Sequence, residues 1–317
     1  SAKTMNRAGY DVQLAAGTIT AGGTLGILIP PSIMLVVMGP ILNIPVTDLF
    51  AAAIMPGLML AALYTGYTLI RCHLNPSLGP VVPEDLIPDS MREVWIEFFK
   101  GLVPPVLLVG SSLGSILAGL ATPTEGAAMG AVGAIFLTLA YRKLTFKVLQ
   151  DALLKTLEIT TLIMVLVCAS NFFGAVFSRL GTPTMLTEYL MVLDLPPMVL
   201  LLMIMALIFL LAWPLEWVPI VLIIIPILMP LVVQILDQLE LPLLWFAILV
   251  AVNLQTAWLS PPVALSAYFL KGVVPEWDLA DIYKGMFQFM MIQVVGLAVI
   301  IIFPKIVLWL PTYLYGN

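Results

Sequence analysis

Charged residues are scarce in this sequence. They make up 10% of its 317 residues, whereas a soluble domain carries about 25%. Hydrophobic residues account for 62%, so a folded chain would have too little polar surface to face water. It must use lipid as the solvent for most of its exterior. The formal net charge of −5 is small, and no basic patch indicates nucleic acid as a partner.

Histidine and cysteine are nearly absent. The single histidine is His73, and the two cysteines, Cys72 and Cys168, lie far apart along the chain. A histidine-based metal site and a Ser-His-Asp triad are therefore not expected. The sequence also lacks a Walker motif for ATP. We expect a protein that is not an enzyme and has no resident cofactor.

Apolar stretches of helix length, separated by short polar loops, fill most of the chain. Most reach the roughly 20 residues that a membrane-spanning helix needs, and no β-strand alternation competes with this pattern. The sequence therefore predicts an all-α integral membrane protein. The predicted segments are a broken helix at 13–42, spans at 49–71, 98–120, 124–141 and 152–177, an interfacial helix at 184–193, two apolar arms at 196–213 and 217–236, a second broken helix at 244–270 and a last span at 280–303.

Positive charges favour one orientation in the membrane. If the loop containing Arg142, Lys143 and Lys147 faces the cytoplasm, eleven of the 13 lysines and arginines lie on that side, as the positive-inside rule requires. The C-terminus then lies on the outer side. The two arms at 196–236 contribute an even number of crossings whether they span or fold back. A re-entrant hairpin and two full spans both remain open.

Two segments of the chain are similar, GTLGILIPPSIML and TAWLSPPVALSAY. Each places a proline pair (30–31 or 261–262) in the middle of an apolar stretch of helix length. Each is followed by an acidic residue at the head of the next span, Asp48 or Asp278. Because the number of crossings between these acids is odd in either topology, we expect the two copies to be inverted relative to each other.

The proline pairs have a specific consequence inside a membrane. Proline donates no backbone hydrogen bond and clashes with the preceding turn, so two in succession open a helix. The freed carbonyl groups are costly in lipid unless a cation, water or neighbouring segment satisfies them. Broken helices in inverted repeats therefore indicate a transporter's binding site near the middle of the bilayer. The alternative is that each pair only kinks a packed helix.

The two arms at 196–236 meet in the sequence WPLEW. If the arms fold back, Glu216 lies deep in the membrane, where ionisable residues are rare and usually functional. If the arms span, Glu216 is an ordinary loop acid, with Trp213 and Trp217 as interface anchors. Trp258, beside the second proline pair, is expected deep in the membrane.

A capping box is predicted at Thr122-Pro123-Thr124-Glu125. The Thr122 hydroxyl and the Glu125 carboxylate would satisfy free N–H groups at the start of the 124–141 span. A direct part in ion or substrate binding is the alternative for this motif.

The chain resembles, along essentially its whole length, the large membrane subunit of TRAP (tripartite ATP-independent periplasmic) transporters. The motifs that carry the resemblance are, in order, KTMNRAGYD, GTLGILIPPSI, GLATPTEGAAMGA, PIVLIIIPILMPLV and VNLQTAWLSPPVALSAYFLKGV. It implies an inverted-repeat, elevator-type transporter in the bacterial inner membrane, with a periplasmic C-terminus and with Na⁺ driving the uptake of small organic acids. It also implies two partners, a small membrane subunit and a periplasmic substrate-binding protein.

The resemblance divides the chain into four parts. It assigns 1–72 to the end of the first inverted repeat, 73–97 to a cytoplasmic connecting loop, 98–195 to second-repeat scaffold helices and 196–317 to the second-repeat transport region with its re-entrant hairpin and broken helix. The tip of the hairpin that pairs with the first break would lie upstream of Ser1, with only the end of that hairpin in 1–72, so the first repeat is incomplete. We therefore expect this chain to be the C-terminal part of a longer subunit.

The hairpin tip departs from the family's commonest pattern. Ala212 and Glu216 stand where glycine and aspartate are usual, and Ser260 replaces a threonine in the last motif. Glutamate and serine keep the oxygen ligands that a hard cation prefers, so sodium binding is still expected.

The resemblance implies sodium at the two breaks and an anionic substrate between them, held by helix N-termini. The candidate sodium ligands are Gly26, Ile27, Pro30, Ser32, Glu216, Thr256, Ser260 and Pro261. The candidate substrate contacts are Trp213, Asn253, Trp258, Pro262 and Thr124. Two other functions remain open, a symporter of related fold that needs no binding protein and a membrane subunit that assembles without transporting.

Overall fold

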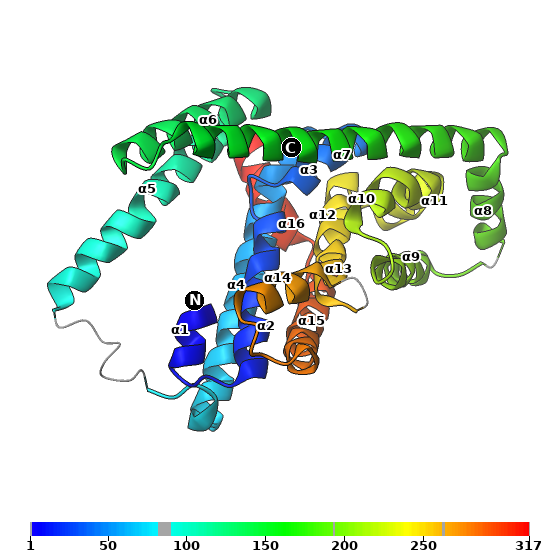
Figure 1. The fold of residues 1–317 in the computed structure, drawn as a ribbon. Coiled ribbons are helices and arrows are strands. Elements are labelled where there is room, and N and C mark those ends of the chain that lie inside the picture. The colour runs from blue at the N-terminus through cyan, green and yellow to red at the C-terminus, as the bar shows by residue number, and fades with distance from the viewer. Residues whose placement is uncertain (1, 82–89, 193, 262–263, 317) are drawn as a thin grey trace. The chain divides into compact units, whose positions relative to one another are not determined.

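The computed structural model describes residues 2–81, 90–192, 194–261 and 264–316. Every regular element within these residues is a helix (Figure 1). Six of the described helices are long and apolar enough to cross a membrane, and one bent pair of helices would make a seventh span. The predicted all-α integral membrane protein is confirmed.

The chain divides into two compact units, which are described separately. The larger comprises Ser1–Val81 and Ala169–Asn317, and the smaller Val82–Cys168. The first part of the larger unit contains α1 (Ala2–Arg7), α2 (Val12–Leu28), α3 (Ile33–Leu42) and α4 (Val46–Leu74). Its second part contains the end of α7 (Phe146–Arg179), α8 (Thr182–Met191), α9 (Pro197–Ala212), α10 (Trp217–Pro219), a π-helical turn (Ile220–Ile224), α11 (Ile225–Leu239), α12 (Leu243–Leu254), α13 (Thr256–Leu259), α14 (Leu265–Val273), α15 (Leu279–Ile302) and α16 (Lys305–Tyr315).

The smaller unit contains α5 (Met91–Leu117), α6 (Pro123–Ala140) and the start of α7. The predicted capping box is confirmed, since the Thr122 amide donates to Glu125 Oε2 at 2.8 Å and the Glu125 amide donates to Thr122 Oγ1 at 3.3 Å. Helix α5 begins at Met91 rather than at residue 98. The end of the predicted 73–97 loop is therefore helical, and its residues 82–89 lie outside the described part.

The core of the larger unit lies among α2, α4, α12 and α15. Helix α12 is almost wholly buried and includes Trp245 and Phe246, both at 0% exposure. Phe289 of α15 packs edge-on against two tyrosines of α4, Tyr64 and Tyr67, with ring centroids 5.7 and 5.3 Å apart. These contacts hold together elements from both ends of the sequence.

Helices α2 and α15 approach closely through glycine. A Cβ on Gly285 would lie 2.0 Å from the carbonyl oxygen of Gln13, and one on Gly17 would lie 2.4 Å from the Phe289 ring. Only residues without a side chain permit this approach. Residues 13 to 17 thus lie beside 281 to 289 in the same order, so α2 runs parallel to α15.

Helix α12 runs the other way along α15. The Trp245 indole donates to the carbonyl of Ile300 at 3.2 Å, and the Gln293 amide donates to the carbonyl of Val252 at 2.8 Å. As residue numbers rise along α12 they fall along α15. Helices α2 and α12, which lead into the two proline pairs, therefore run in opposite directions, as the predicted inversion requires (Figure 1).

Both predicted helix breaks are present in the structure. Helices α2 and α3 meet at a bend of 41° over residues 29–32. At the second break, α12 ends at Leu254 and is followed by the short α13. The chain is extended at Ser260, and α14 begins at Leu265. Each segment is therefore interrupted near its proline pair and does not run through as one continuous helix.

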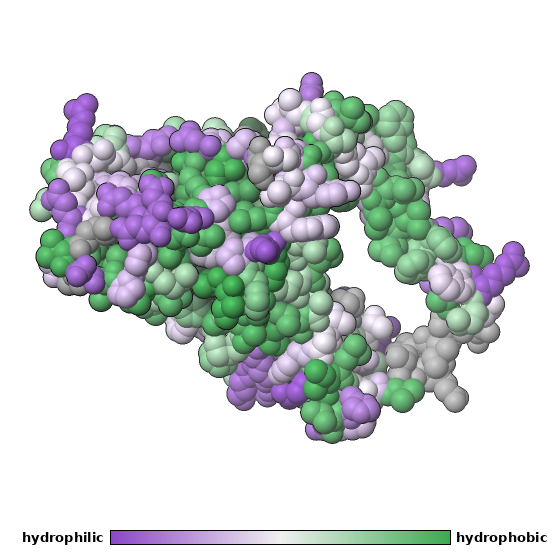
Figure 2. Space-filling model, turned by 180° about the vertical axis from the view of Figure 1, so that it is seen from behind, coloured by the Kyte–Doolittle hydropathy of each residue, from purple (hydrophilic) through white to green (hydrophobic). Residues whose placement is uncertain are grey.

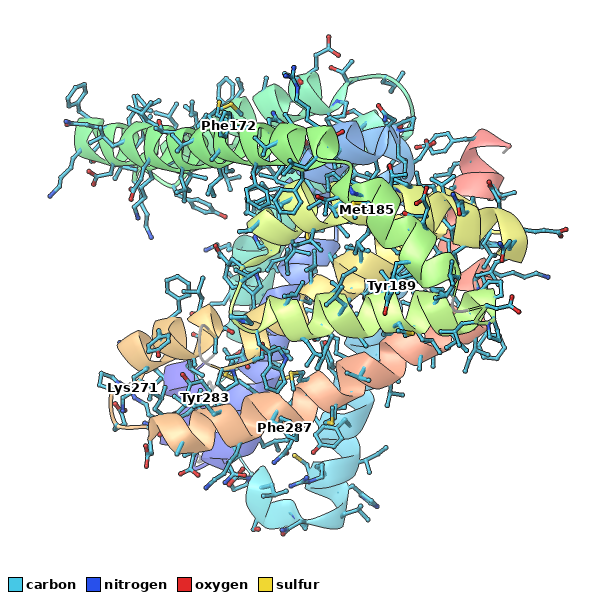
Figure 3. The ribbon with its side chains drawn as sticks, turned by 90° about the vertical axis from the view of Figure 1, so that its right-hand side faces the viewer. Phe172, Met185, Tyr189, Lys271, Tyr283 and Phe287 are labelled. Carbon is cyan, nitrogen blue, oxygen red and sulfur yellow. The ribbon has the colours of Figure 1, made fainter. Side chains whose placement is uncertain are left out.

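Apolar side chains also cover much of the exterior. Figure 2 shows broad hydrophobic areas on the face it presents, with polar side chains gathered in separate patches. Phe172, Met185 and Phe287 are 76%, 67% and 52% exposed and point outward in Figure 3. Such a surface suits lipid rather than water.

Candidate functional site

Ser32 organises the first break. It is 2% exposed and caps α3, because its hydroxyl accepts a hydrogen bond from the Leu35 amide. The same hydroxyl donates to the carbonyl of Ile27, near the end of α2. Ser32 thus satisfies one backbone group that the break frees. Gly26 is exposed, with open space where a Cβ would stand, and Pro30 is buried.

The second break holds several buried polar side chains. The Thr256 hydroxyl donates to the carbonyl of Asn253 at 2.7 Å, and the Asn253 amide donates to the carbonyl of Met205 in α9 at 2.8 Å. This bond ties the first arm of the predicted hairpin to the broken helix. Ser260 is fully buried, and Pro261 is exposed. Pro262 lies outside the described residues.

A group of buried polar atoms near this break has no hydrogen-bond partner among the described residues. Buried polar groups are nearly always paired, so a group of exceptions calls for water or a ligand. These atoms are Trp213 Nε1, Asn253 Oδ1, Gln255 Nε2, Trp258 Nε1, Ser260 Oγ and Gln293 Oε1. They include both donors and acceptors, and four of the six residues are among the predicted site residues.

Gln255 and Gln293 are the functional candidates that sequence reasoning missed. The Gln293 amide donates to Gln255 Oε1 at 3.1 Å, and both residues are 0% exposed. A glutamine within an apolar span is itself a signal, because polar residues inside membrane segments are costly. Gln293 lies within the predicted span 280–303, so the sequence alone could have marked it as a candidate.

The hairpin tip lies beside the second break. The Trp213 ring packs edge-on against Phe209. It also packs against a buried cluster that includes Leu259 and Ala264. Glu216 is half-buried and forms no ion pair with any described residue. Helix α3 contacts both α12 and the π-helical turn that follows the tip. The structure thus brings the tip and both breaks into one region of the larger unit.

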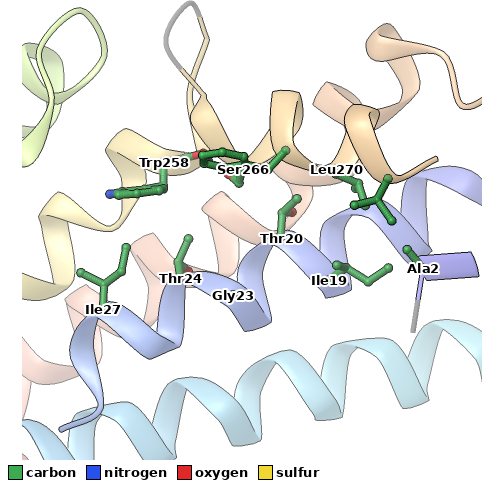
Figure 4. Close-up of a pocket in the computed structure, with 11 residues that line it drawn as sticks. Ala2, Ile19, Thr20, Gly23, Thr24, Ile27, Trp258, Ser266 and Leu270 are labelled. Carbon is green, nitrogen blue, oxygen red and sulfur yellow. Dashed lines mark hydrogen bonds between the residues drawn. The ribbon is translucent and has the colours of Figure 1, made fainter. Parts of the chain in front are cut away.

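A cavity of about 480 Å³ lies between α2 and the α13–α14 segment (Figure 4). Two predicted site residues line it, Ile27 and Trp258. The remaining lining residues are Ala2, Ile19, Thr20, Gly23, Thr24, Ser266, Phe269, Leu270 and Val273. None of the lining residues carries a charge.

Thr124 is a predicted substrate contact that belongs to the other unit of the chain. It lies in the first turn of α6, in the smaller unit, and its side chain is exposed. Within that unit its neighbours Thr122 and Glu125 are engaged in capping.

The fold is that of an α-helical membrane protein built on two oppositely directed broken helices. A model of the DctM component of tripartite ATP-independent periplasmic transporters matches residues 1–306. The chain belongs to this family of transporter permeases, which are not enzymes.

Three curated relatives illustrate the family. The sialic acid TRAP transporter permease protein SiaT of Haemophilus influenzae is 27% identical over 98% of this chain and 49% of its own length. The large permease protein SiaM of Vibrio cholerae is 28% identical over 99% of this chain and 71% of its own. The C4-dicarboxylate large permease protein DctM of Pseudomonas aeruginosa is 29% identical over 98% and 70%. The chain thus spans about half the length of the first relative and about 70% of the other two.

Proposed function

We propose that this chain acts within the permease subunit of a sodium-coupled, binding-protein-dependent importer of small organic acids in the bacterial inner membrane. The group of buried, unpartnered polar atoms at the second break carries the proposal. Such atoms are retained in a membrane protein where an ion or substrate completes their hydrogen bonding or coordination. One of these residues, Trp258, lines a cavity between α2 and the α13–α14 segment, and its place between oppositely directed broken helices supports a transport role.

The relatives support an acid as substrate. Their names specify sialic acid, C4-dicarboxylate and, for a third member from Escherichia coli, 2,3-diketo-L-gulonate. All three are carboxylates at neutral pH. The tripartite family name supports two further partners, a small membrane subunit and a periplasmic substrate-binding protein. We assign the C-terminus to the periplasmic side on the distribution of lysine and arginine.

Sodium would bind oxygen atoms at the two breaks. At the first, the Ile27 carbonyl and the Ser32 hydroxyl already lie together. At the second, Ser260 Oγ and Asn253 Oδ1 are buried oxygens without a partner among the described residues, and the half-buried Glu216 supplies a carboxylate at the adjoining tip. Hard cations select such oxygen ligands. The anion would lie between the breaks, and an elevator movement of the unit that holds both breaks would carry it across.

The test uses the complete subunit with its two partners, reconstituted in liposomes. Uptake of a labelled carboxylate should require an inward sodium gradient. Ser260→Ala and Glu216→Gln should each raise the sodium concentration for half-maximal uptake by about tenfold. Glu240→Gln, which changes an exposed acid after α11, should leave it unchanged. Unaltered sodium dependence in both site variants would contradict the assignment.

The partners are tested in the same system. Omitting the binding protein should abolish uptake. Full uptake without it would favour the alternative, a binding-protein-independent sodium/anion symporter of related fold. Absence of any sodium-dependent flux from the complete assembly would favour a membrane subunit that does not transport.

A further inference from the structure

We propose that a pocket beside the first turns of α15 binds the phosphate headgroup of an anionic phospholipid. The pocket has a volume of about 500 Å³. Its lining residues, which all belong to the larger unit, are Gln13, Pro261, Tyr283, Lys284, Phe287 and Gln288. The inference goes beyond the proposed transport function and does not depend on it.

A chain of hydrogen bonds joins α4, α15 and α2 at this pocket. Arg71 Nη1 donates to the Tyr67 hydroxyl at 2.8 Å, and that hydroxyl donates to Gln288 Oε1 at 2.9 Å. Gln288 Nε2 donates in turn to Gln13 Oε1 at 3.5 Å. The side-chain oxygens of both lining glutamines are therefore used as acceptors within the chain of bonds.

The same chain of bonds continues to Lys284. The Lys284 ammonium and the Gln13 amide both donate to Asp281 Oδ1, each at 3.1 Å. An ammonium has three N–H groups and a side-chain amide has two, so Lys284, Gln13 and Gln288 each keep an N–H group for a ligand. Asp281 itself does not line the pocket. The pocket thus offers mainly donors, which suits a phosphate with its several acceptor oxygens.

The charges around the pocket favour an anion. Arg71 and Lys284 are positive and Asp281 is negative, so these three residues of the chain of bonds carry a net charge of +1. Both cations lie on the side that the positive-inside rule assigns to the cytoplasm. Basic pockets between membrane helices on this side bind anionic lipid headgroups. A zwitterionic headgroup brings a cation of its own, which this net charge would repel.

An apolar stripe of α15 begins at the pocket. Its exposed residues at helical spacing are Phe287, Met291 and Val295. Figure 3 shows Phe287 and Tyr283 on the side of α15 that is turned toward the viewer. From Phe287 to Val295 the helix rises about 12 Å, which fits within one leaflet of a hydrocarbon core about 30 Å thick. An acyl chain can therefore run along this stripe from a headgroup in the pocket.

Lys284 suits the boundary between headgroup and hydrocarbon. Its side chain is 63% exposed, and a lysine can rest its methylene groups on apolar surface while its ammonium stays at the polar level. It precedes Phe287 by three residues, so the two lie on one side of the helix. The polar and apolar parts of a phospholipid would thus meet matching surfaces. A headgroup held there would also touch Pro261 at the second break.

The experiment measures thermal stabilisation of the purified complete subunit by added lipid in detergent. Phosphatidylglycerol, which is anionic, should stabilise the protein at lower concentration than zwitterionic phosphatidylcholine. Lys284→Gln should raise the phosphatidylglycerol concentration for half-maximal stabilisation about fivefold. Lys305→Gln changes an exposed lysine at the start of α16 and should leave this concentration unchanged. Inorganic phosphate, which has no acyl chain, should not stabilise the protein.

Several results would overturn the inference. Equal stabilisation by the two lipids would mean that the headgroup charge is not recognised. An unchanged response in Lys284→Gln would place the lipid elsewhere, and an equal loss in Lys305→Gln would reduce the effect to general surface charge. Stabilisation by inorganic phosphate would identify a soluble anion as the ligand. No stabilisation by phosphatidylglycerol would mean that another part of the complete subunit fills the pocket. Sodium-driven uptake tests the proposed function separately from all of these.

Discussion

The side-chain amide of Gln293 donates a hydrogen bond of 2.8 Å to the carbonyl oxygen of Val252. The acceptor lies in the last turn of α12, just before the second broken helix changes direction. The same amide reaches Gln255 Oε1 at 3.1 Å. Helix α15 therefore supports the break from the side, by adding a second donor to a carbonyl that the Gln255 backbone amide reaches at 3.3 Å.

Replacing Gln293 with leucine should destabilise the larger unit. The Gln255 side-chain oxygen would lose its donor in a fully buried place, which costs about 1–3 kcal/mol for an unsatisfied group, while the Val252 carbonyl would keep only the Gln255 backbone amide at 3.3 Å. Thermal unfolding in detergent would measure the loss. Gln238→Leu removes an exposed amide from α11 and should leave the midpoint of thermal unfolding unchanged. Equal unfolding midpoints for the two variants would show that the Gln293 hydrogen bonds contribute nothing to stability.

Gly17→Ala should separate α2 from α15. Its new methyl group would lie 2.4 Å from Phe289 and 2.6 Å from the carbonyl of Gly285, so one helix must shift, at a cost of about 1–3 kcal/mol. The thermal midpoint should fall accordingly. Gly22→Ala on the same helix meets open space and should be neutral or slightly stabilising. A midpoint for Gly17→Ala that matches this control would refute the close approach.

Asn253→Leu should loosen the first arm of the predicted hairpin. The change removes the donor that holds the Met205 carbonyl of α9 at 2.8 Å, a bond worth about 1 kcal/mol. Hydrogen exchange of amides around Met205 should accelerate about fivefold. Asn171→Leu removes an exposed amide from α7 and should not affect α9. Protection that persists in Asn253→Leu would mean that α9 is held by apolar packing instead.

Thr122→Ala should fray the start of α6. It deletes the hydroxyl that accepts from the Glu125 amide, and loss of such a cap costs about 1 kcal/mol. Exchange of the Glu125 amide should increase about fivefold. Thr122→Ser keeps the hydroxyl and should restore protection. If the serine variant exchanges as fast as the alanine variant, the capping bond is not what orders this turn.

Local chemistry explains what could be predicted well. The two breaks follow from the missing N–H of proline, and the capping box follows from residue types at fixed spacing. The start of α5 was harder to predict from the sequence, because charged residues such as Arg92 and Glu93 are typical of a loop between membrane spans. Those turns are helical in the structure. The short α16 after the last predicted span was not predicted.

The site was predicted in part for the same reason. Candidate residues at the breaks could be named from the sequence because they adjoin the prolines, as Ser32 and Ser260 do. Gln293 was missed because its importance depends on which helix it faces. Sodium coordination and the substrate contacts remain predictions that the experiments above address.

The sequence by itself determined where the chain is apolar enough to cross lipid and where its helices must open, because hydrophobic length and proline act over a few neighbouring residues. Only the tertiary structure decided that α15 lies between α2 and α12, parallel to one and antiparallel to the other. That arrangement depends on contacts between residues far apart in the chain, such as Gly17 with Gly285 and Val252 with Gln293. The cavity exists because these distant pairs set the separation of the broken helices.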